Sequence, residues 1–465
     1  MTLLDAEAVE APPPLRRNRE FLLLWSGASL SFLATRVTSV AYPLIVLWHT
    51  GSPLAMSVVT TAALVPLLLV QLPAGAVVDR FDRRRLMLGC EAGRILTVGS
   101  VALALAAGRL SVAHLAAVAF AESACAVFYK LAERGAVRNL VHPAHLPAAL
   151  AQNEARGRAA GLLGQPGGAL LYSAARWLPF GFGALAYACS FVSLLLIRKD
   201  FQQERTGAAA PRRMTAEVAE GMRWLWRQRF LRAALGYVAG TNVLFQMLAL
   251  ALILRVKEEG LPPSTLAIVM GVGGIGGLVG ALAGSRLERR TSRRALLIAG
   301  AVAWALLIGA MGFTAEPVLL GLLYAGTGFV GAVFNVSAAV YQVSTTPDAL
   351  QGRVAATATL IGSGTNALGS FAGGLLLAAW GAEPTVRTIA AAMAVLAVLA
   401  TLAPDLRREL PNGANAATSR DEARPAVLGP GSRRELPGGA GAVASRGEAR
   451  PAVPGPGSRR ELPGG

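Results

Sequence analysis

Two charged side chains, Arg36 and Glu122, stand inside long apolar segments of this 465-residue chain. Charged groups inside a membrane span are costly and tend to mark function. Counted from the same side, Arg36 lies about 12 and Glu122 about 11 residues deep, so at ~1.5 Å per residue they share one depth. We predict an ion pair between them, with Glu122 losing or keeping a proton according to whether Arg36 stays close. The alternative is a static pair that only holds two helices together.

The second half of the chain has polar candidates but no deep carboxylate. Asn242 and Gln246 are four residues apart and share a helix face, where they either hydrogen-bond a substrate or tie helices together. So few polar groups favour a hydrophobic or weakly cationic small molecule over a sugar or a phosphate. The candidates in this half are Asn242, Gln246, Asn335, Tyr341 and Asn366.

Several other kinds of site are excluded by spacing. The three cysteines lack CxxC spacing, and His142 and His145 lack a matching cluster, so we expect neither a disulfide framework nor a metal. The run GVGGIGG at 271–277 fits GxGxxG but lies inside an apolar 20-mer, which favours helix packing through small residues. Without a nucleophile–base arrangement or a Walker loop, we expect neither an enzyme nor a cofactor.

The elements that must position these residues are membrane-spanning helices. Hydrophobic residues make up 54% of the chain and charged ones only 15%, against roughly 25% charged in soluble domains. Apolar windows of ~20 residues, the length that crosses a bilayer, recur throughout. Twelve spans in two sets of six are predicted, near 21–48, 55–78, 86–108, 111–132, 150–172 and 180–197, then 233–254, 264–284, 295–313, 317–343, 353–379 and 385–403. Glu91 and Arg94, three apart on the third span, predict a local salt bridge.

The distribution of positive charge predicts the orientation. With the N-terminus inside, the inner loops hold 27 Lys and Arg residues and the outer loops five. Lys and Arg collect in cytoplasmic loops, so both termini are expected in the cytoplasm. The net charge of +17 is accounted for by topology and does not call for a nucleic-acid partner.

A dense charge cluster, GAVVDRFDRRRLM at 75–87, follows the second span. Its pattern resembles the signature between spans 2 and 3 of the major facilitator superfamily, with Asp82 in place of a second glycine. Glycine there permits close helix packing. The resemblance implies that Asp79 meets a helix N-terminus or an arginine and that the arginines latch the two halves together; the alternative is a basic loop that only sets topology. The matching residues are Gly75, Asp79, Arg80, Asp82, Arg83 and Arg84.

Other stretches resemble one particular branch of this superfamily. Residues 146–172 are similar to spans 4–5 of the drug- and siderophore-exporting branch, which includes enterobactin and macrolide exporters, and 350–364 resembles its span 11. Gly164, Pro166 and Gly168 match the glycine- and proline-rich antiporter motif of span 5. A degenerate copy of the charge cluster lies at 280–294, as expected if the two halves are repeats of one unit. Spans 1, 4, 7 and 10 line the cavity in this superfamily, so the resemblance implies that Arg36 and Glu122 face it.

The predicted organisation has five parts. A polar cytoplasmic segment (1–20) precedes the first six-helix half (21–197), and a cytoplasmic loop (198–232) leads to the second half (233–403). The loop holds Trp224 and Trp226 in either an interfacial helix or a plain linker. The tail at 404–465 repeats every 26 residues, is rich in Pro and Gly, and is predicted to be disordered.

The sequence thus predicts an all-α membrane protein with twelve transmembrane helices and the major facilitator fold. We expect a monomeric secondary transporter in a bacterial cytoplasmic membrane, contacting lipid, protons and a small-molecule substrate. Proton-coupled efflux of a small hydrophobic or weakly cationic molecule is the expected activity. The alternatives are an importer or lipid flippase of the same fold, or a non-transporting sensor or scaffold.

Overall fold

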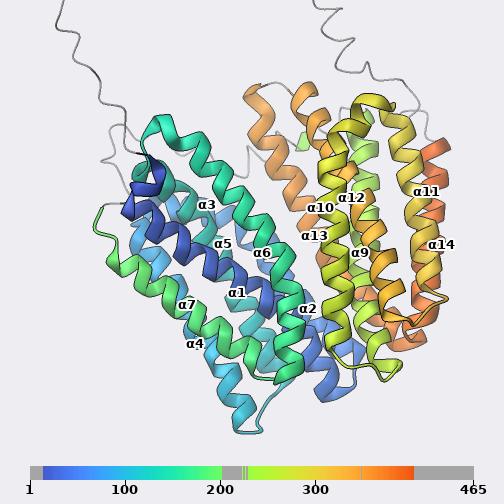
Figure 1. Ribbon diagram of the computed structural model, residues 1–465, viewed down its shortest axis with the longest axis horizontal. Coiled ribbons are helices and arrows are strands. Elements are labelled where there is room, and N and C mark those ends of the chain that lie inside the picture. Colours follow the sequence, from blue (N-terminus) through green and yellow to red (C-terminus); the bar gives the residue numbers. More distant parts are fainter. Residues whose placement is uncertain are drawn as a thin grey trace, which may run out of the picture. The chain divides into compact units, whose positions relative to one another are not determined.

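The computed structural model describes residues 14–199, 201, 222–223, 226, 229–346 and 348–402. Within these ranges every regular element is helical (Figure 1). After a short 3-10 helix, Leu15–Arg17, the first half consists of α1 (Arg19–Thr50), α2 (Pro53–Leu69), α3 (Gln71–Arg80), α4 (Arg83–Ala106), α5 (Val112–Leu140), α6 (Leu146–Ala174) and α7 (Leu178–Leu196), with a second 3-10 helix at Pro143–His145.

The second half contains six more long helices. They are α9 (Arg229–Glu258), α10 (Ser264–Arg290), α11 (Arg293–Met311), α12 (Pro317–Thr345), α13 (Asp348–Trp380) and α14 (Ala382–Leu402). All belong to one compact unit, residues 1–413. Most of the loop segment at 216–233 and the whole tail at 404–465 lie outside the described residues, so the interfacial helix and the disordered tail stay predictions.

Each of the twelve predicted spans corresponds to a helix or a pair of helices, but not all are equally apolar. Ten described helices are long and apolar enough to cross a membrane, and the pair α2–α3 makes eleven. That pair is bent by 58°, next to Pro73, which has no N–H to donate to the preceding turn. The remaining helix, α6, carries Glu154, Arg156 and Arg158 in its first half, which lowers its hydropathy.

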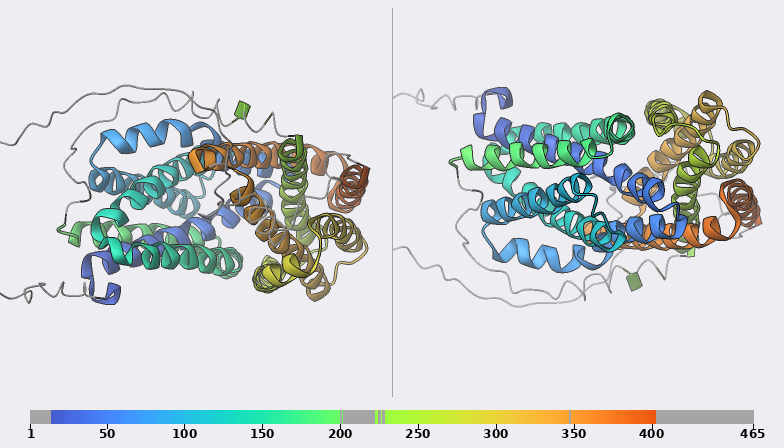
Figure 2. Two further views of the ribbon diagram at one scale, coloured as in Figure 1. Left: turned by 90° about the horizontal axis from the view of Figure 1, so that it is seen from above. Right: turned by 90° about the horizontal axis from the view of Figure 1, so that it is seen from below.

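The packing within and between the halves is specific. In the first half α1 packs on α6 and α7, and α4 on α5 and α7. In the second half α9 packs on α13 and α14, and α11 on α12 and α14 (Figure 2). Two large contacts join the halves, α2 with α13 and α6 with α10, and a smaller one joins α1 with α9.

The closest helix pair, α10 and α12, packs through glycine. A Cβ at Gly276 or Gly280 would overlap the backbone of Ala325 or Phe329, and one at Gly273 would meet the Tyr324 ring. Small residues let helix backbones approach this closely. The predicted packing role of 271–277 is therefore confirmed.

The two ends of the bundle differ in charge. The connections at 81–82, 141–145 and 291–292 lie at one end, called here the basic end, beside the arginines of 83–85 and 286–294. At the opposite, far end, Gly51 follows the last residue of α1 and caps it, with a φ of 73° that suits glycine. There Lys257 of α9 donates from Nζ to the Leu47 carbonyl oxygen at 2.6 Å, and so joins the halves.

Candidate functional site

Glu122 is buried near the middle of α5 and is held by hydroxyl groups. Its side chain is 3% exposed. Thr38 Oγ1 donates to Oε1 at 2.7 Å, Tyr187 donates to the same oxygen, and Tyr42 donates to Oε2. The oxygens of this buried carboxyl group thus have their hydrogen-bond partners within the protein.

The predicted ion pair between Arg36 and Glu122 is wrong. Arg36 is exposed, and its guanidinium lies over the Phe32 ring, 5.0 Å from the ring centre. Equal depth does not bring two side chains together, because rotation about each helix axis also decides which residues meet. At 3.6 residues per turn, Arg36 lies about 200° around the helix from Thr38, which faces Glu122. Arg36 instead faces α6, where a Cβ on Gly164 would overlap it.

The charged neighbours of this site come from α4. Arg94, 3% exposed, lies 3.7 Å from Glu91 Oε2 and donates from Nη1 to Ser31 Oγ at 2.8 Å. The predicted Glu91–Arg94 salt bridge is confirmed, although it lies in the interior of the half. The Arg94 guanidinium also lies over the Tyr187 ring, 4.9 Å from its centre, and so connects Glu91 with the shell of Glu122.

A second chain of hydroxyls completes the arrangement. The hydroxyl oxygens of Tyr129 and Ser190 lie 3.2 Å apart, within hydrogen-bonding distance. Ser190 Oγ donates to Glu91 Oε1 at 2.9 Å. Arg94 Nε and Glu91 Oε2 are buried without a hydrogen bond to any described residue. These side chains together are called here the buried polar network: Ser31, Thr38, Tyr42, Glu91, Arg94, Glu122, Tyr129, Tyr187 and Ser190.

The network rests on one polar face of each of four helices. On α1, Ser31, Thr35, Thr38 and Tyr42 recur at intervals of four, three and four residues, which places them on one face. Each of the other three helices also contributes two network residues from one face, because the two are three or seven residues apart. The pairs are Glu91 and Arg94 on α4, Glu122 and Tyr129 on α5, and Tyr187 and Ser190 on α7. Sequence reasoning based on charge alone missed the hydroxyls, although the polar stripe on α1 was a usable signal.

The polar candidates of the second half do not form a comparable network within the described residues. Asn242 and Gln246 face α13 near Gly362 and Gly369, but neither amide has a hydrogen bond to a described residue. The hydrogen-bonded helix tie is therefore not observed. Asn366, on α13, is half-buried, Asn335 on α12 is exposed, and the side chain of Tyr341 is outside the description.

The charge cluster at 75–87 organises one half. Asp82 caps α4, accepting from Arg85 N at 2.7 Å, and Arg84 donates to the last carbonyls of α7 at Leu194 and Leu195. Cations suit a helix C-terminus. The expected latch between halves is not seen among the described residues, because the hydrogen-bond partners of Arg83 and Arg84 lie in α7 or at Phe201 shortly after it.

Other members of the cluster have plainer environments. Asp79 is exposed and has no hydrogen bond or ion pair with a described residue, so its expected partner is also not observed. Arg80 is exposed next to it, and Gly75 is half-buried on α3. Arg83 donates to the Phe201 carbonyl at 3.4 Å.

The span 5 motif supports packing on two sides of α6. A Cβ at Gly168 would lie 2.5 Å from the Val37 carbonyl oxygen, so this glycine allows α6 to approach α1. Pro166 faces Gly271 of α10, which belongs to the other half. The motif is therefore part of the contact between the halves.

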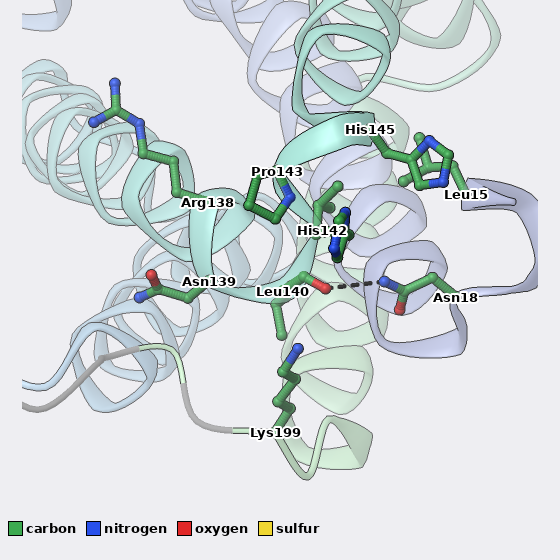
Figure 3. Close-up of a pocket in the computed structure, with 10 residues that line it drawn as sticks. Leu15, Asn18, Arg138, Asn139, Leu140, His142, Pro143, His145 and Lys199 are labelled. Carbon is green, nitrogen blue, oxygen red and sulfur yellow. Dashed lines mark hydrogen bonds between the residues drawn. The ribbon is translucent and has the colours of Figure 1, made fainter. Parts of the chain in front are cut away.

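A separate cavity of about 410 Å³ lies at the basic end, lined by Leu15, Asn18, Arg138, Asn139, Leu140, Val141, His142, Pro143, His145 and Lys199. Figure 3 shows Asn18, His142 and Lys199 gathered around Leu140, with Arg138 directed away. Asn18 Nδ2 donates to the Leu140 carbonyl at 2.9 Å and so holds the start of α1 to the end of α5. Within the described residues no cluster of three metal ligands exists here or elsewhere.

Solved structures with the same arrangement of helices establish the fold. The nucleoside transporter NupG superposes with a TM-score of 0.67 over 82% of this chain and 97% of its own, at 13% identity. A bacterial homologue of the human lysosomal transporter Spinster, in an inward-facing and unoccupied conformation, gives 0.62 over 83% and 96%, also at 13% identity. The fold is that of the major facilitator transporters, and the protein is a multi-pass membrane protein.

The sequence narrows this class further. The profile of the transmembrane secretion effector family, within the major facilitator superfamily, matches residues 11–428, and the chain belongs to that family. It is 28% identical over 407 residues to the multidrug efflux pump Tap of Mycolicibacterium fortuitum, covering 83% of this chain and 96% of Tap. It is 27% identical over 381 residues to the uncharacterised transporter YfiS of Bacillus subtilis strain 168, covering 79% and 89%. The protein is a transporter and not an enzyme.

Proposed function

We propose that this transporter exports a small hydrophobic or weakly cationic molecule in exchange for protons. It would act as a monomer in a bacterial cytoplasmic membrane, with both termini in the cytoplasm. The similarity to Tap, which is named as a multidrug efflux pump, supports export of this kind. The burial of Glu122 among hydroxyl donors is the observation that carries proton coupling.

The hydroxyl shell suits both charge states of Glu122. Thr38 Oγ1 also lies 3.1 Å from the Ala34 carbonyl, and Tyr187 OH lies 3.1 Å from Thr35 Oγ1. The hydroxyls of Thr38 and Tyr187 each carry one hydrogen, which can turn to these second acceptors. A protonated Glu122 can therefore donate from Oε1 to one of these two hydroxyls, and an ionised Glu122 can accept from Thr38, Tyr187 and Tyr42, without movement of heavy atoms.

The test is efflux of lipophilic cations and macrolides from cells that lack their own pumps. We expect Glu122→Gln to reduce efflux to the level of cells without the transporter, because glutamine cannot exchange a proton. A protonophore should have the same effect on the wild type. The matched control is Glu154→Gln, which removes a 71% exposed carboxylate paired with Arg158 and should leave efflux unchanged.

The outcomes separate coupling from transport. Efflux that survives Glu122→Gln but stops with the protonophore would move proton coupling to another residue. Efflux that survives both treatments would contradict the proton-coupled mechanism altogether.

A further inference from the structure

The buried polar network contains two carboxylates and one guanidinium. Glu91 is fully buried, and Glu122 and Arg94 are each 3% exposed. An ionised carboxylate buried without a counter-ion is costly, and one guanidinium offsets one such charge. The network is therefore electrically neutral only if one of the two carboxylates carries a proton.

Among the residues that the structure describes, the surroundings supply no second counter-ion. In the described part of the first half, the one other buried charged side chain is Glu133, which lies 2.7 Å from Arg156 and forms its own neutral pair. The remaining titratable groups that face the carboxylates are hydroxyls and thiols, and none of them is a cation. They are Tyr42 on α1, Cys90 on α4, Cys125 and Tyr129 on α5, and Tyr187 on α7.

Arg94 lies between the two carboxylates. Its Nη1 is 3.7 Å from Glu91, and its guanidinium rests on the ring of Tyr187, whose hydroxyl donates to Glu122. The Arg94 guanidinium is also close enough to Glu122 for opposite charges on the two groups to attract each other. In this arrangement Glu91 has the ion pair, and Glu122 has partners that accommodate a proton.

The two carboxylates lie at different depths. Counted from the far end, Glu122 lies ten residues into α5 and Glu91 fifteen residues into α4, or about 15 Å and about 23 Å at 1.5 Å per residue. Glu91 is thus nearer the basic end. A proton that leaves one carboxylate for the other changes depth in the membrane.

We infer that Glu91 and Glu122 are coupled proton-binding residues that share Arg94 as their counter-ion and hold one exchangeable proton between them. This inference rests on the proposed function for its meaning in transport and adds a second proton-binding position to it. Coupled groups of this kind titrate as a pair.

The test is an infrared titration of the purified full-length protein, which follows the carbonyl band of a protonated carboxylic acid without any substrate. Glu122→Gln should remove the band. Glu91→Gln should keep it but lower its midpoint by about one pH unit or more, because Arg94 then serves Glu122 alone and favours its ionised form. Arg94→Gln should raise the midpoint.

The control variant is Glu133→Gln, a buried carboxylate with its own arginine, which should leave the midpoint in place. Each variant is used only if its size-exclusion profile and thermal transition match the wild type. If Arg94→Gln fails to fold, Arg94→Lys replaces it. Arg94→Lys keeps the positive charge and should preserve the wild-type midpoint within a few tenths of a pH unit. A midpoint that Glu91→Gln does not move overturns the coupling. The efflux assay with Glu122→Gln reports separately on the proposed function, since its failure leaves the infrared result intact.

Discussion

The two halves of this transporter have related helices but different interiors. Arg94 is the twelfth residue of α4 and Glu122 the eleventh of α5, counted from Arg83 and Val112. At the same positions in α11 and α12, counted from Arg293 and Pro317, stand Trp304 and Thr327. There Trp304 Nε1 donates to the Thr327 carbonyl at 3.0 Å, so the second half places a neutral hydrogen bond where the first places charges.

The two halves are therefore expected to have different roles in transport. Buried charges that share hydroxyl partners give the first half groups that can change protonation. The second half is built on close glycine contacts between α10 and α12 and on aromatic contacts such as Phe245 with Trp304, whose ring centres lie 5.0 Å apart. A repeated fold thus supports one half with buried carboxylates and one in which Arg255 is the single buried charged side chain among the described residues, and proton binding is expected to reside in the first.

The largest difference should appear when the central residue of each interior is replaced. Arg94→Leu leaves two buried carboxylates without a counter-ion and should cost about 3–5 kcal/mol of stability. Trp304→Phe removes one hydrogen bond and should cost about 1 kcal/mol. Thermal unfolding of the purified protein measures both. Equal losses would contradict the contrast between the halves, and Arg158→Leu, at an exposed ion pair, is the control with little effect.

A smaller loss of stability is expected when a glycine at the contact between α10 and α12 in the second half is replaced. Gly276→Ala places a methyl group against the Ala325 backbone and should cost about 1–3 kcal/mol through overpacking. At the neighbouring Gly277, an added Cβ would have its nearest contact at 3.9 Å, so Gly277→Ala is the matched control. In the first half, Gly99→Ala on α4 should be tolerated, because nothing lies within 4 Å. Loss of stability in all three would mean that glycine acts through backbone flexibility instead of packing.

The smallest predicted effect concerns a feature that the halves share. Asp82 caps α4, and Ser292 caps α11 by accepting from Ala295 N at 3.2 Å. Asp82→Ala and Ser292→Ala should each cost about 1 kcal/mol in thermal unfolding. Asp79→Ala removes a carboxylate without a described partner and should change stability little. A larger loss for Asp79→Ala than for Asp82→Ala would show that the signature acts through a contact outside the described residues.

Hydropathy predicted the helices well because the bilayer imposes a length and an apolar composition on each span. The segment predicted at 21–48 is α1 at Arg19–Thr50, and that at 111–132 is the first part of α5. Glu122 was also identified, because a deep charge is visible in the sequence.

The partners of Glu122 were not identified, because depth fixes only one coordinate of a helical residue. Rotation about the axis decides whether Arg36 or Thr38 faces Glu122, and it depends on packing between helices. For the same reason Arg84 could not be assigned from its loop to the end of α7. Short polar side chains such as Ser190 carry no charge to mark them, yet they complete the network.

The contact from Lys257 to Leu47 bears on how the chain is made. The Leu47 carbonyl already accepts from Gly51 N–H at 3.0 Å, so Lys257 adds a second, charge-assisted hydrogen bond between positions 210 residues apart. During synthesis, the end of α1 can therefore form by itself, and this contact is added only after α9 has entered the membrane. Residues 1–197 expressed alone should insert with the end of α1 formed, and co-expression of the remaining chain should add the contact between the halves.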